Sequence, residues 1–164
     1  MKIVYTSNTG YTKQYAELLA EKTGYELFEI NNALEKLPKN EEIIFLGWLM
    51  AGKIKDYKKA SKYFSVKIIA AVGLATGGER DKEVRQANSI PSDTTLFTLQ
   101  GGYAPEKLKG IYKFMMKLVT KVLAKQLREK AVRNEEEEFL LSLLENGGNG
   151  VSEEKLAPLL EFLN

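Results

Sequence analysis

Short apolar runs alternate with longer amphipathic segments through the first 100 of the 164 residues. Strands are predicted at residues 2–6, 25–30, 43–47, 66–72 and 94–99. The third and fourth runs are continuously apolar, which is typical of central strands that are buried on both faces. The second run contains two glutamates, which favour a more exposed, outer position in the sheet.

Helices are predicted between these strands, at residues 12–23, 53–64 and 79–88, with a short helical turn at 33–37. Strands that alternate with helices of about ten to fifteen residues require a parallel sheet covered by helices on both faces. We therefore predict an α/β fold with a three-layer, doubly wound sheet of five parallel strands.

A long helix is predicted at residues 106–130, where apolar side chains recur at helical spacing and lysines lie opposite them. We interpret it as the last helix of the sandwich, packed on the sheet. The alternative is an amphipathic helix that faces a membrane surface or a partner.

Two further leucine-rich helices follow, one from Glu135 and one capped by Ser152, with the flexible sequence GGNG at residues 147–150 between them. Their leucines must be buried, either against the rest of the chain or against another subunit in a homodimer. We therefore divide the chain into a domain at residues 1–130 and a helical C-terminal extension at residues 131–164. A length of 164 residues suffices for one domain with a sizeable core but is short for two.

The chain contains no cysteine and no histidine. This composition excludes disulfides, the usual zinc sites, thiol nucleophiles and imidazole bases. Any redox chemistry must therefore come from a bound cofactor. No apolar run approaches the roughly 18 residues of a membrane span, and the first residues lead into a strand rather than a signal peptide, so we expect a cytoplasmic protein.

The net charge of +2 is distributed unevenly along the chain. Residues 1–134 carry 23 basic and 14 acidic side chains, whereas residues 135–164 carry one basic and eight acidic side chains. The resulting charges of +9 and −7 indicate an acidic tail that folds against a basic body, or a basic surface used by a partner. Solvated helix faces explain the same pattern about equally well.

Three loops rich in small residues each follow a predicted strand, at residues 7–12, 48–52 and 74–78. In a doubly wound sheet, ligands bind beyond the carboxyl ends of the strands, where the strand order reverses. We therefore expect these loops to converge on one site.

The first loop opens a helix and consists of Ser7, Asn8, Thr9, Gly10, Tyr11 and Thr12. Hydroxyls, backbone N–H groups and the positive end of a helix dipole together favour an anion. The loop has neither the Gly-Lys-[Ser/Thr] ending of a P-loop nor a Gly-x-Gly-x-x-Gly pattern, and it contains no Lys or Arg. It therefore predicts a site for a terminal monophosphate that is held mainly by neutral dipoles.

Residues 3–12, with Ala16 and Leu19 after them, resemble the flavodoxin signature, and the resemblance extends in register over residues 1–130. It implies a flavodoxin-like sheet of order 2-1-3-4-5 with FMN as the cofactor. By this resemblance, hydroxyls around the FMN phosphate come from Ser7, Thr9 and Thr12, and backbone amides come from Asn8, Gly10 and Tyr11.

The resemblance assigns the other two loops to the flavin ring. The second loop would lie along the isoalloxazine and consists of Trp48, Leu49, Met50, Ala51 and Gly52. A peptide free to flip at Gly52 would offer its carbonyl to the flavin N5–H, because glycine tolerates both backbone states. Trp48 either shields the ring or fills the core. The third loop has no aromatic residue to cover the opposite face of the ring, and consists of Gly73, Leu74, Ala75, Thr76, Gly77 and Gly78.

The resemblance favours an FMN-binding protein that carries or transfers electrons to a redox partner protein, with no catalytic side chain and no metal. Lysines after the second loop would stabilise a reduced, anionic flavin and raise its potential; they are Lys53, Lys55, Lys58 and Lys59. We expect no nucleic-acid partner and no transmembrane segment, while peripheral contact with a membrane remains open.

Two alternative functions differ from an electron carrier. Residues 101–103 and 114–118 are similar to the flavodoxin-domain family that includes the menaquinone-dependent protoporphyrinogen oxidases. That similarity implies an FMN-dependent oxidoreductase with a quinone or another small molecule as substrate. The other alternative is a flavin-free binding or assembly module that acts through its C-terminal helices.

Overall fold

The computed structural model describes residues 1–76 and 79–164. The contacts within the chain divide it into two compact units. The first unit contains Met1–Gly101 and Val151–Asn164, and the second unit contains Gly102–Gly150. These units do not follow the boundary expected near residue 130, and the division into a domain and an extension stays a prediction.

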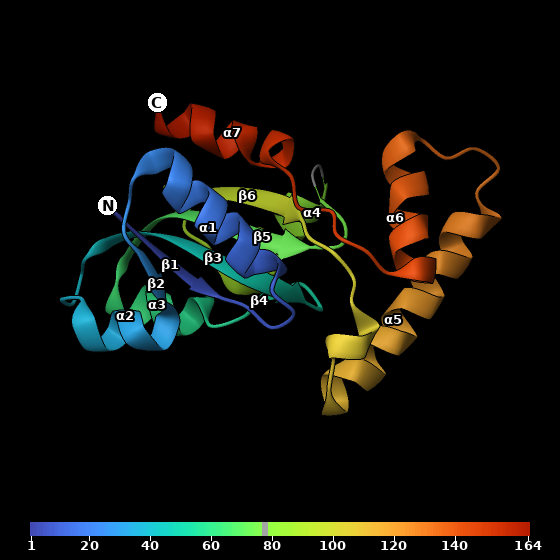
Figure 1. Ribbon diagram of the computed structural model, residues 1–164, viewed down its shortest axis with the longest axis horizontal. Helices are drawn as coiled ribbons and strands as arrows, with labels where there is room; N and C mark the ends of the chain where they lie inside the picture. The colour runs from blue at the N-terminus through green and yellow to red at the C-terminus, as the bar shows by residue number, and fades with distance from the viewer. Residues whose placement is uncertain (77–78) are drawn as a thin grey trace. The chain divides into compact units, whose positions relative to one another are not determined.

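The first unit is built on a parallel sheet, as predicted (Figure 1). Its strands lie in the order β2-β1-β3-β5-β6, where β1 is Lys2–Thr6, β2 is Leu27–Glu29, β3 is Glu42–Met50, β5 is Ser65–Gly73 and β6 is Thr95–Gln100. A further strand, β4 (Lys53–Ile54), lies off this path and pairs antiparallel with the end of β3. The α/β class is therefore confirmed, and the order of the parallel strands is compatible with the predicted 2-1-3-4-5.

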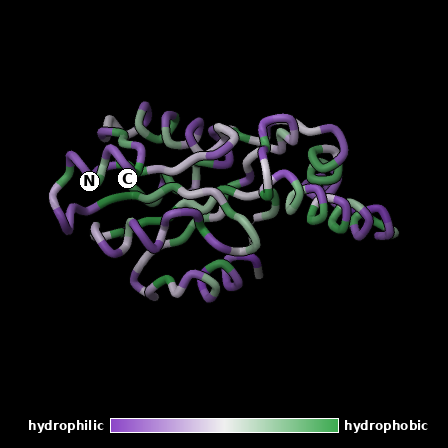
Figure 2. The backbone as a smooth tube through the Cα atoms, turned by 90° about the horizontal axis from the view of Figure 1, so that it is seen from below, coloured by the Kyte–Doolittle hydropathy of each residue, from purple (hydrophilic) through white to green (hydrophobic). Residues whose placement is uncertain are grey.

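The central strands β3 and β5 are buried on both faces, as their continuous apolar runs predicted. Residues 43–46 of β3 and 69–71 of β5 have no exposed surface. β3 pairs with β1 on one side and with β5 on the other, so that Phe45 lies between Val4 and Ile69. Figure 2 shows these strands as long hydrophobic stretches of the backbone. The sheet interior therefore supplies the rigid base from which the loops leave.

Helices cover both faces of this sheet (Figure 1). α1 (Tyr11–Thr23) and α7 (Glu153–Leu163) lie on one face. On the other face are α2 (Ile30–Lys36), α3 (Tyr57–Tyr63) and α4 (Glu79–Asn88), whose apolar side chains share one core with β1, β3 and β5. The first unit is thus a three-layer sandwich.

Two predicted elements are wrong at their boundaries. The helix predicted from residue 53 starts only at Tyr57, because Lys53–Ile54 continues the sheet as β4 and Ile54 is buried in the core. The strand predicted at residues 25–30 is shorter, because Ile30 begins α2 and is buried there. In both cases burial of one isoleucine decides where the element changes.

α7 occupies a position on the sheet that we had expected for the helix at residues 106–130. It packs against α1 and β6, and its Leu156 and Leu159 have no exposed surface. Ser152 caps it by accepting a hydrogen bond from the Lys155 N–H at 3.3 Å. The leucines of the C-terminal segment are therefore buried against the body of this same chain.

The second unit contains a short 3₁₀ helix, η1 (Pro105–Lys107), followed by α5 (Gly110–Glu129) and α6 (Glu135–Asn146). α5 and α6 pack on each other. The buried side chains along these helices are Thr120, Ala124 and Leu127 from α5, and Leu141, Leu143 and Leu144 from α6. The predicted long helix thus begins at Gly110, later than expected.

Hydrogen bonds stabilise the second unit at two places, between its two ends and at the start of α6. Tyr103 and Gly148 exchange backbone hydrogen bonds of 2.9 and 2.8 Å, which ties its two ends together. Asn134 and Glu137 form a capping box at the start of α6. None of the helices in residues 1–76 and 79–164 combines the length and apolar character needed to cross a membrane.

Candidate functional site

The carboxyl ends of three strands lie close together in the first unit. The Gly101 N–H donates to the Gly73 carbonyl at 2.7 Å. A Cβ at Gly101 would lie 3.5 Å from the Cβ of Tyr11, and a Cβ at Gly73 would lie 3.0 Å from the Cδ1 of Leu49. Tyr11, Leu49 and Gly73 belong to the three loops selected from the sequence, so the structure brings those loops to one edge.

The first loop leads into the N-terminus of α1, whose N-cap residue, Gly10, has no side chain to cap the helix. Gly10 is the N-cap with φ +100°, a left-handed backbone that glycine adopts without strain, and nothing lies within 4 Å of where its Cβ would be. The first turn of α1 contains no acidic residue. No carboxylate of this turn therefore competes with an anion at the positive end of the helix.

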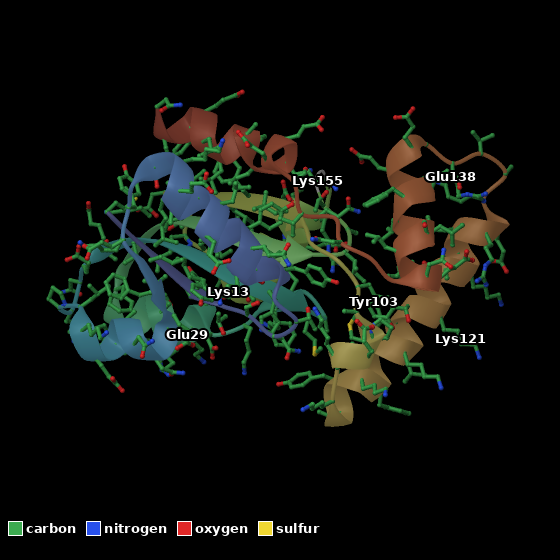
Figure 3. All side chains as sticks on the ribbon, viewed as in Figure 1. Lys13, Glu29, Tyr103, Lys121, Glu138 and Lys155 are labelled. Carbon is green, nitrogen blue, oxygen red and sulfur yellow. The ribbon has the colours of Figure 1, made fainter. Side chains whose placement is uncertain are left out.

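The polar side chains of this loop surround the same helix end. Ser7 Oγ accepts a long hydrogen bond of 3.4 Å from the Lys13 N–H. Within the described residues, the hydroxyls of Thr9 and Thr12 have no hydrogen-bond partner, although Thr12 is only 2% exposed. Lys13 is the nearest basic residue along the chain, and its ammonium pairs with Glu17 at 3.5 Å (Figure 3). The loop thus offers neutral donors and no committed cation.

Asp56 is a residue of this edge that the sequence did not reveal. The Thr6 hydroxyl, at the end of β1, donates to Asp56 Oδ2 at 2.9 Å. Asp56 is held in a left-handed backbone with φ 57°, between β4 and α3, and the Lys55 ammonium lies 4.0 Å from its carboxylate. A negative charge therefore lies at the end of β1, where the first loop begins, and the positive charge of Lys55 offsets part of it.

The second loop is a β-hairpin rather than an open segment. Trp48, Leu49 and Met50 are the last residues of β3, and Ala51 and Gly52 form the turn into β4 with φ 48° and 76°. Two successive positive φ values define the type I′ turn that matches strand twist. Trp48 is half-buried.

Asn88 of α4 fixes this hairpin. Its Nδ2 donates to the Gly52 carbonyl at 2.8 Å, and its Oδ1 accepts from the Ile54 N–H at 2.8 Å. The Lys53 ammonium also bonds to the carbonyl of Ala87. The Gly52 peptide that we expected to be free is therefore held, because a side chain from α4 satisfies it.

The lysines after the second loop do not act as one cationic group. The Lys59 ammonium donates to Asn31 Oδ1 at 2.8 Å. Lys53 is bound to α4 and Lys55 lies beside Asp56, while Lys58 is exposed on α3. The expected effect on a reduced flavin would thus come mainly from the Lys55–Asp56 pair, whose charges partly cancel.

The third loop is tied to β6 and α7. Gln100 Nε2 donates to the Leu74 carbonyl at 3.1 Å, and Gln100 Oε1 accepts from the Lys155 ammonium at 2.7 Å (Figure 3). The Gln100 carbonyl accepts from the Tyr15 hydroxyl at 2.7 Å. Burial raises the pKa of Tyr15 to about 12, so this phenol remains protonated and structural at neutral pH.

The remaining residues of the third loop are only partly described. Ala75 is half-buried and Thr76 is exposed, while Gly77 and Gly78 lie outside the described residues. α4 begins directly after them, and the Arg80 guanidinium pairs with Glu83 at 3.2 Å. Arg80 Nε is buried without a hydrogen-bond partner in the described part of the chain. Arg80 adds a cation near this loop that the sequence analysis did not select.

The fold and this edge define an α/β protein with a parallel sheet, in which a loop of hydroxyl residues leads into the start of the first helix. A comparison with models of known protein families finds no match, and a comparison with curated proteins finds none either. In the described residues no group of three or more acidic side chains is placed to hold a metal ion. The sheet with its flanking helices is compatible with a flavodoxin-like fold, and the flavodoxin resemblance rests on that fold and on residues 3–12.

Proposed function

We propose that this protein binds FMN at the carboxyl edge of its sheet and carries electrons through the flavin. The observation that carries the proposal is the N-terminus of α1, which starts at Gly10 with no acidic residue in its first turn and follows a loop of hydroxyl residues. Backbone N–H groups and hydroxyls at a helix N-terminus suit a phosphate monoester. The flavin would supply the redox chemistry, since the chain has no cysteine or histidine of its own.

The residues present fit a phosphate of this size. Gly10 leaves open space at the helix end, and the hydroxyls of Thr9 and Thr12 lack partners within the described residues. Ser7 Oγ already lies near the first turn through its contact with Lys13 N. We assign the phosphate to Ser7, Thr9, Thr12 and the N–H groups of residues 8–11. Asp56 disfavours any additional negative charge, which favours a monophosphate over a triphosphate.

The other two loops would hold the ring. The hairpin at residues 48–54 carries half-buried Trp48 near the end of β3, next to a turn that Asn88 fixes. The third loop is anchored at Leu74 by Gln100. In this arrangement the protein binds and orients the ring, and no side chain acts as an acid or base.

Purification tests the proposal directly. The protein expressed in cells should be yellow, and mass spectrometry of the supernatant after denaturation should find FMN. Apoprotein should quench the fluorescence of added FMN on binding. If no flavin is found and added FMN is not quenched, the proposal is contradicted, and the flavin-free module becomes the better interpretation.

A quinone-linked oxidoreductase is the second candidate. It is favoured by the third loop, which carries no aromatic residue between Gly73 and Thr76 to cover the ring. Oxidation of protoporphyrinogen with a quinone as acceptor tests it. Steady turnover supports the oxidase, whereas reduction by a flavodoxin reductase without turnover supports the carrier.

A further inference from the structure

The second unit carries an exposed apolar stripe along α5. Ile111, Phe114, Leu118 and Val122 are 68%, 65%, 52% and 56% exposed, respectively. Their spacing of three, four and four residues places them on one side of the helix. Single apolar residues on a surface are ordinary, whereas apolar residues that share one side make the helix amphipathic on its exposed side.

This stripe is not the side of α5 that packs on α6. The buried positions of α5 are Thr120, Ala124 and Leu127. At 100° per residue, Thr120 and Leu127 lie about 160–200° around the helix from Leu118. α5 therefore has one side that is buried and an opposite apolar side that its own hairpin partner leaves uncovered.

Lysines follow the stripe along the first three turns: Lys117 and Lys121 lie about 60° around the helix from its nearest residue, and Lys113 lies about 100° away, towards the side of Thr120. Lys113, Lys117 and Lys121 are exposed and follow one another at intervals of four residues, with Lys121 labelled in Figure 3. The only acidic residue of α5 is Glu129, at its last position. Like charges at this spacing disfavour the helix unless something anionic neutralises them.

The acidic residues of α6 do not supply that neutralisation. Ion pairs join Lys130 to Glu137, Arg133 to Glu138 and Arg128 to Glu145, and all three lie at the C-terminal end of α5 or just beyond it. Among the described residues, Lys113, Lys117 and Lys121 have no ion-pair partner. The N-terminal part of α5 thus combines uncovered apolar area with uncompensated positive charge.

We propose that α5 docks this protein on an anionic lipid surface, with the apolar stripe in the interface and Lys117 and Lys121, on its flank, at the headgroups. Helices of this composition bind in the plane of the interface and prefer anionic lipids. The proposal goes beyond flavin binding, since it concerns where the protein acts.

A second copy of the chain fits this face less well. The stripe is about 16 Å long at 1.5 Å per residue and about 10 Å wide, so it covers on the order of 160 Å². A stable dimer buries about 800 Å² on each partner. A twofold contact through the same stripe would also bring the lysines of two copies together.

Sedimentation of the full-length protein with vesicles tests the proposal. The probes are phosphatidylcholine vesicles and vesicles with about 30% phosphatidylserine, at low salt and at about 1 M salt, where screening is nearly complete. We expect binding to the anionic vesicles at low salt, with strong loss at high salt and weak binding to phosphatidylcholine. Equal binding to both vesicles, or none to either, would overturn the proposal.

Two variants separate the apolar and the basic contributions. L118S/V122S should abolish sedimentation with anionic vesicles, and K117E/K121E should weaken it at least 25-fold, at about fivefold for each charge lost and more on reversal. Matched controls are V132S, at another exposed apolar residue of the same unit, and K36E/K39E in the first unit. Controls that lose as much binding as the α5 variants would contradict the assignment.

The same variants distinguish this proposal from self-association and from flavin binding. The molecular mass in solution should be unchanged by L118S/V122S, and a dimer that this variant dissociates would overturn the proposal in favour of a second copy. All α5 variants should retain the FMN affinity of the unmodified protein, so that a failure of flavin binding leaves the vesicle test intact.

Discussion

The first and second loops leave the same edge of the sheet, but they use their polar groups in different ways. At the first loop, the N-cap residue Gly10 has no capping side chain and the hydroxyls of Thr9 and Thr12 lack partners in the described residues. At the second loop, Asn88 satisfies both the Gly52 carbonyl and the Ile54 N–H. Unsatisfied groups can bind a ligand, whereas satisfied groups fix a shape.

Replacing both threonines of the first loop should give the largest effect. Hydrogen bonds to a charged group contribute about 1.5–3 kcal/mol each, so T9V/T12V should weaken FMN binding about 100-fold or more. Thermal unfolding of the apoprotein should change little, since neither hydroxyl has a partner to lose. Thr23→Val, at the other end of α1, is the control for FMN titrations and should leave the affinity unchanged.

The stability of the protein at alkaline pH should test the role of Tyr15, whose hydroxyl donates to the Gln100 carbonyl. Burial raises the folded-state pKa of Tyr15 to about 12, above the value near 10 of an unfolded chain. The folded protein therefore keeps the phenol proton longer, and this contribution is complete below pH 10 and is lost as pH rises towards 12. The free energy of unfolding should fall across that window, by at most about 2.7 kcal/mol from this group, and the melting temperature should fall with it.

The variant Tyr15→Phe makes that test specific. It should be less stable than the unmodified protein at neutral pH, because the hydroxyl bond to the Gln100 carbonyl is lost. Its stability should nevertheless fall less steeply between pH 10 and 12. Tyr25→Phe is the matched control, and a slope as shallow as that of Tyr15→Phe would refute the role of Tyr15.

Removing the Asn88 side chain, which holds the second loop, should lower the stability of the fold and leave phosphate binding at the first loop unchanged. Asn88→Ala loses bonds to Gly52 and Ile54 and should lower the free energy of unfolding by about 2 kcal/mol. Chemical denaturation measures this, with exposed Asn32→Ala as control. A variant as stable as the control would show that the hairpin does not depend on Asn88.

Substitutions in the turn at residues 51 and 52 should change the stability least, and the two substitutions should act in opposite directions. Gly52→Ala should destabilise by about 1 kcal/mol, since φ 76° is unfavourable for a residue with a Cβ and the added carbon would meet only Ala87 at 3.8 Å. Ala51→Gly should be neutral or slightly stabilising, because φ 48° already strains alanine. Denaturation midpoints that shift in the same direction would argue against the type I′ turn.

The sequence was sufficient for the parts of the fold that local pattern controls. The apolar runs of β3 and β5 predicted buried central strands, and the hydroxyl loop predicted the start of the first helix. β4 was missed because only two residues pair, and the decisive fact is burial of Ile54 in a core made by distant segments.

Long-range contacts explain what the sequence did not predict at the candidate site. Asp56 lies 50 residues from its partner Thr6, and Asn88 lies 36 residues from Gly52. Nothing in the local pattern marks either pairing. The same holds for Lys155. Its contact with Gln100 depends on the packing of α7 on the sheet, and the helical spacing of residues 106–130 gave equal reason to expect the helix of those residues in that place.

Comparison of FMN with riboflavin is the most direct test of the central claim, that the first loop binds a phosphate monoester. The two ligands share the ring and differ in the phosphate, and both report binding by fluorescence quenching of the apoprotein. We expect FMN to bind at least about 100-fold more tightly than riboflavin, and T9V/T12V to remove most of that difference. Equal affinity of the unmodified protein for FMN and riboflavin would contradict the account.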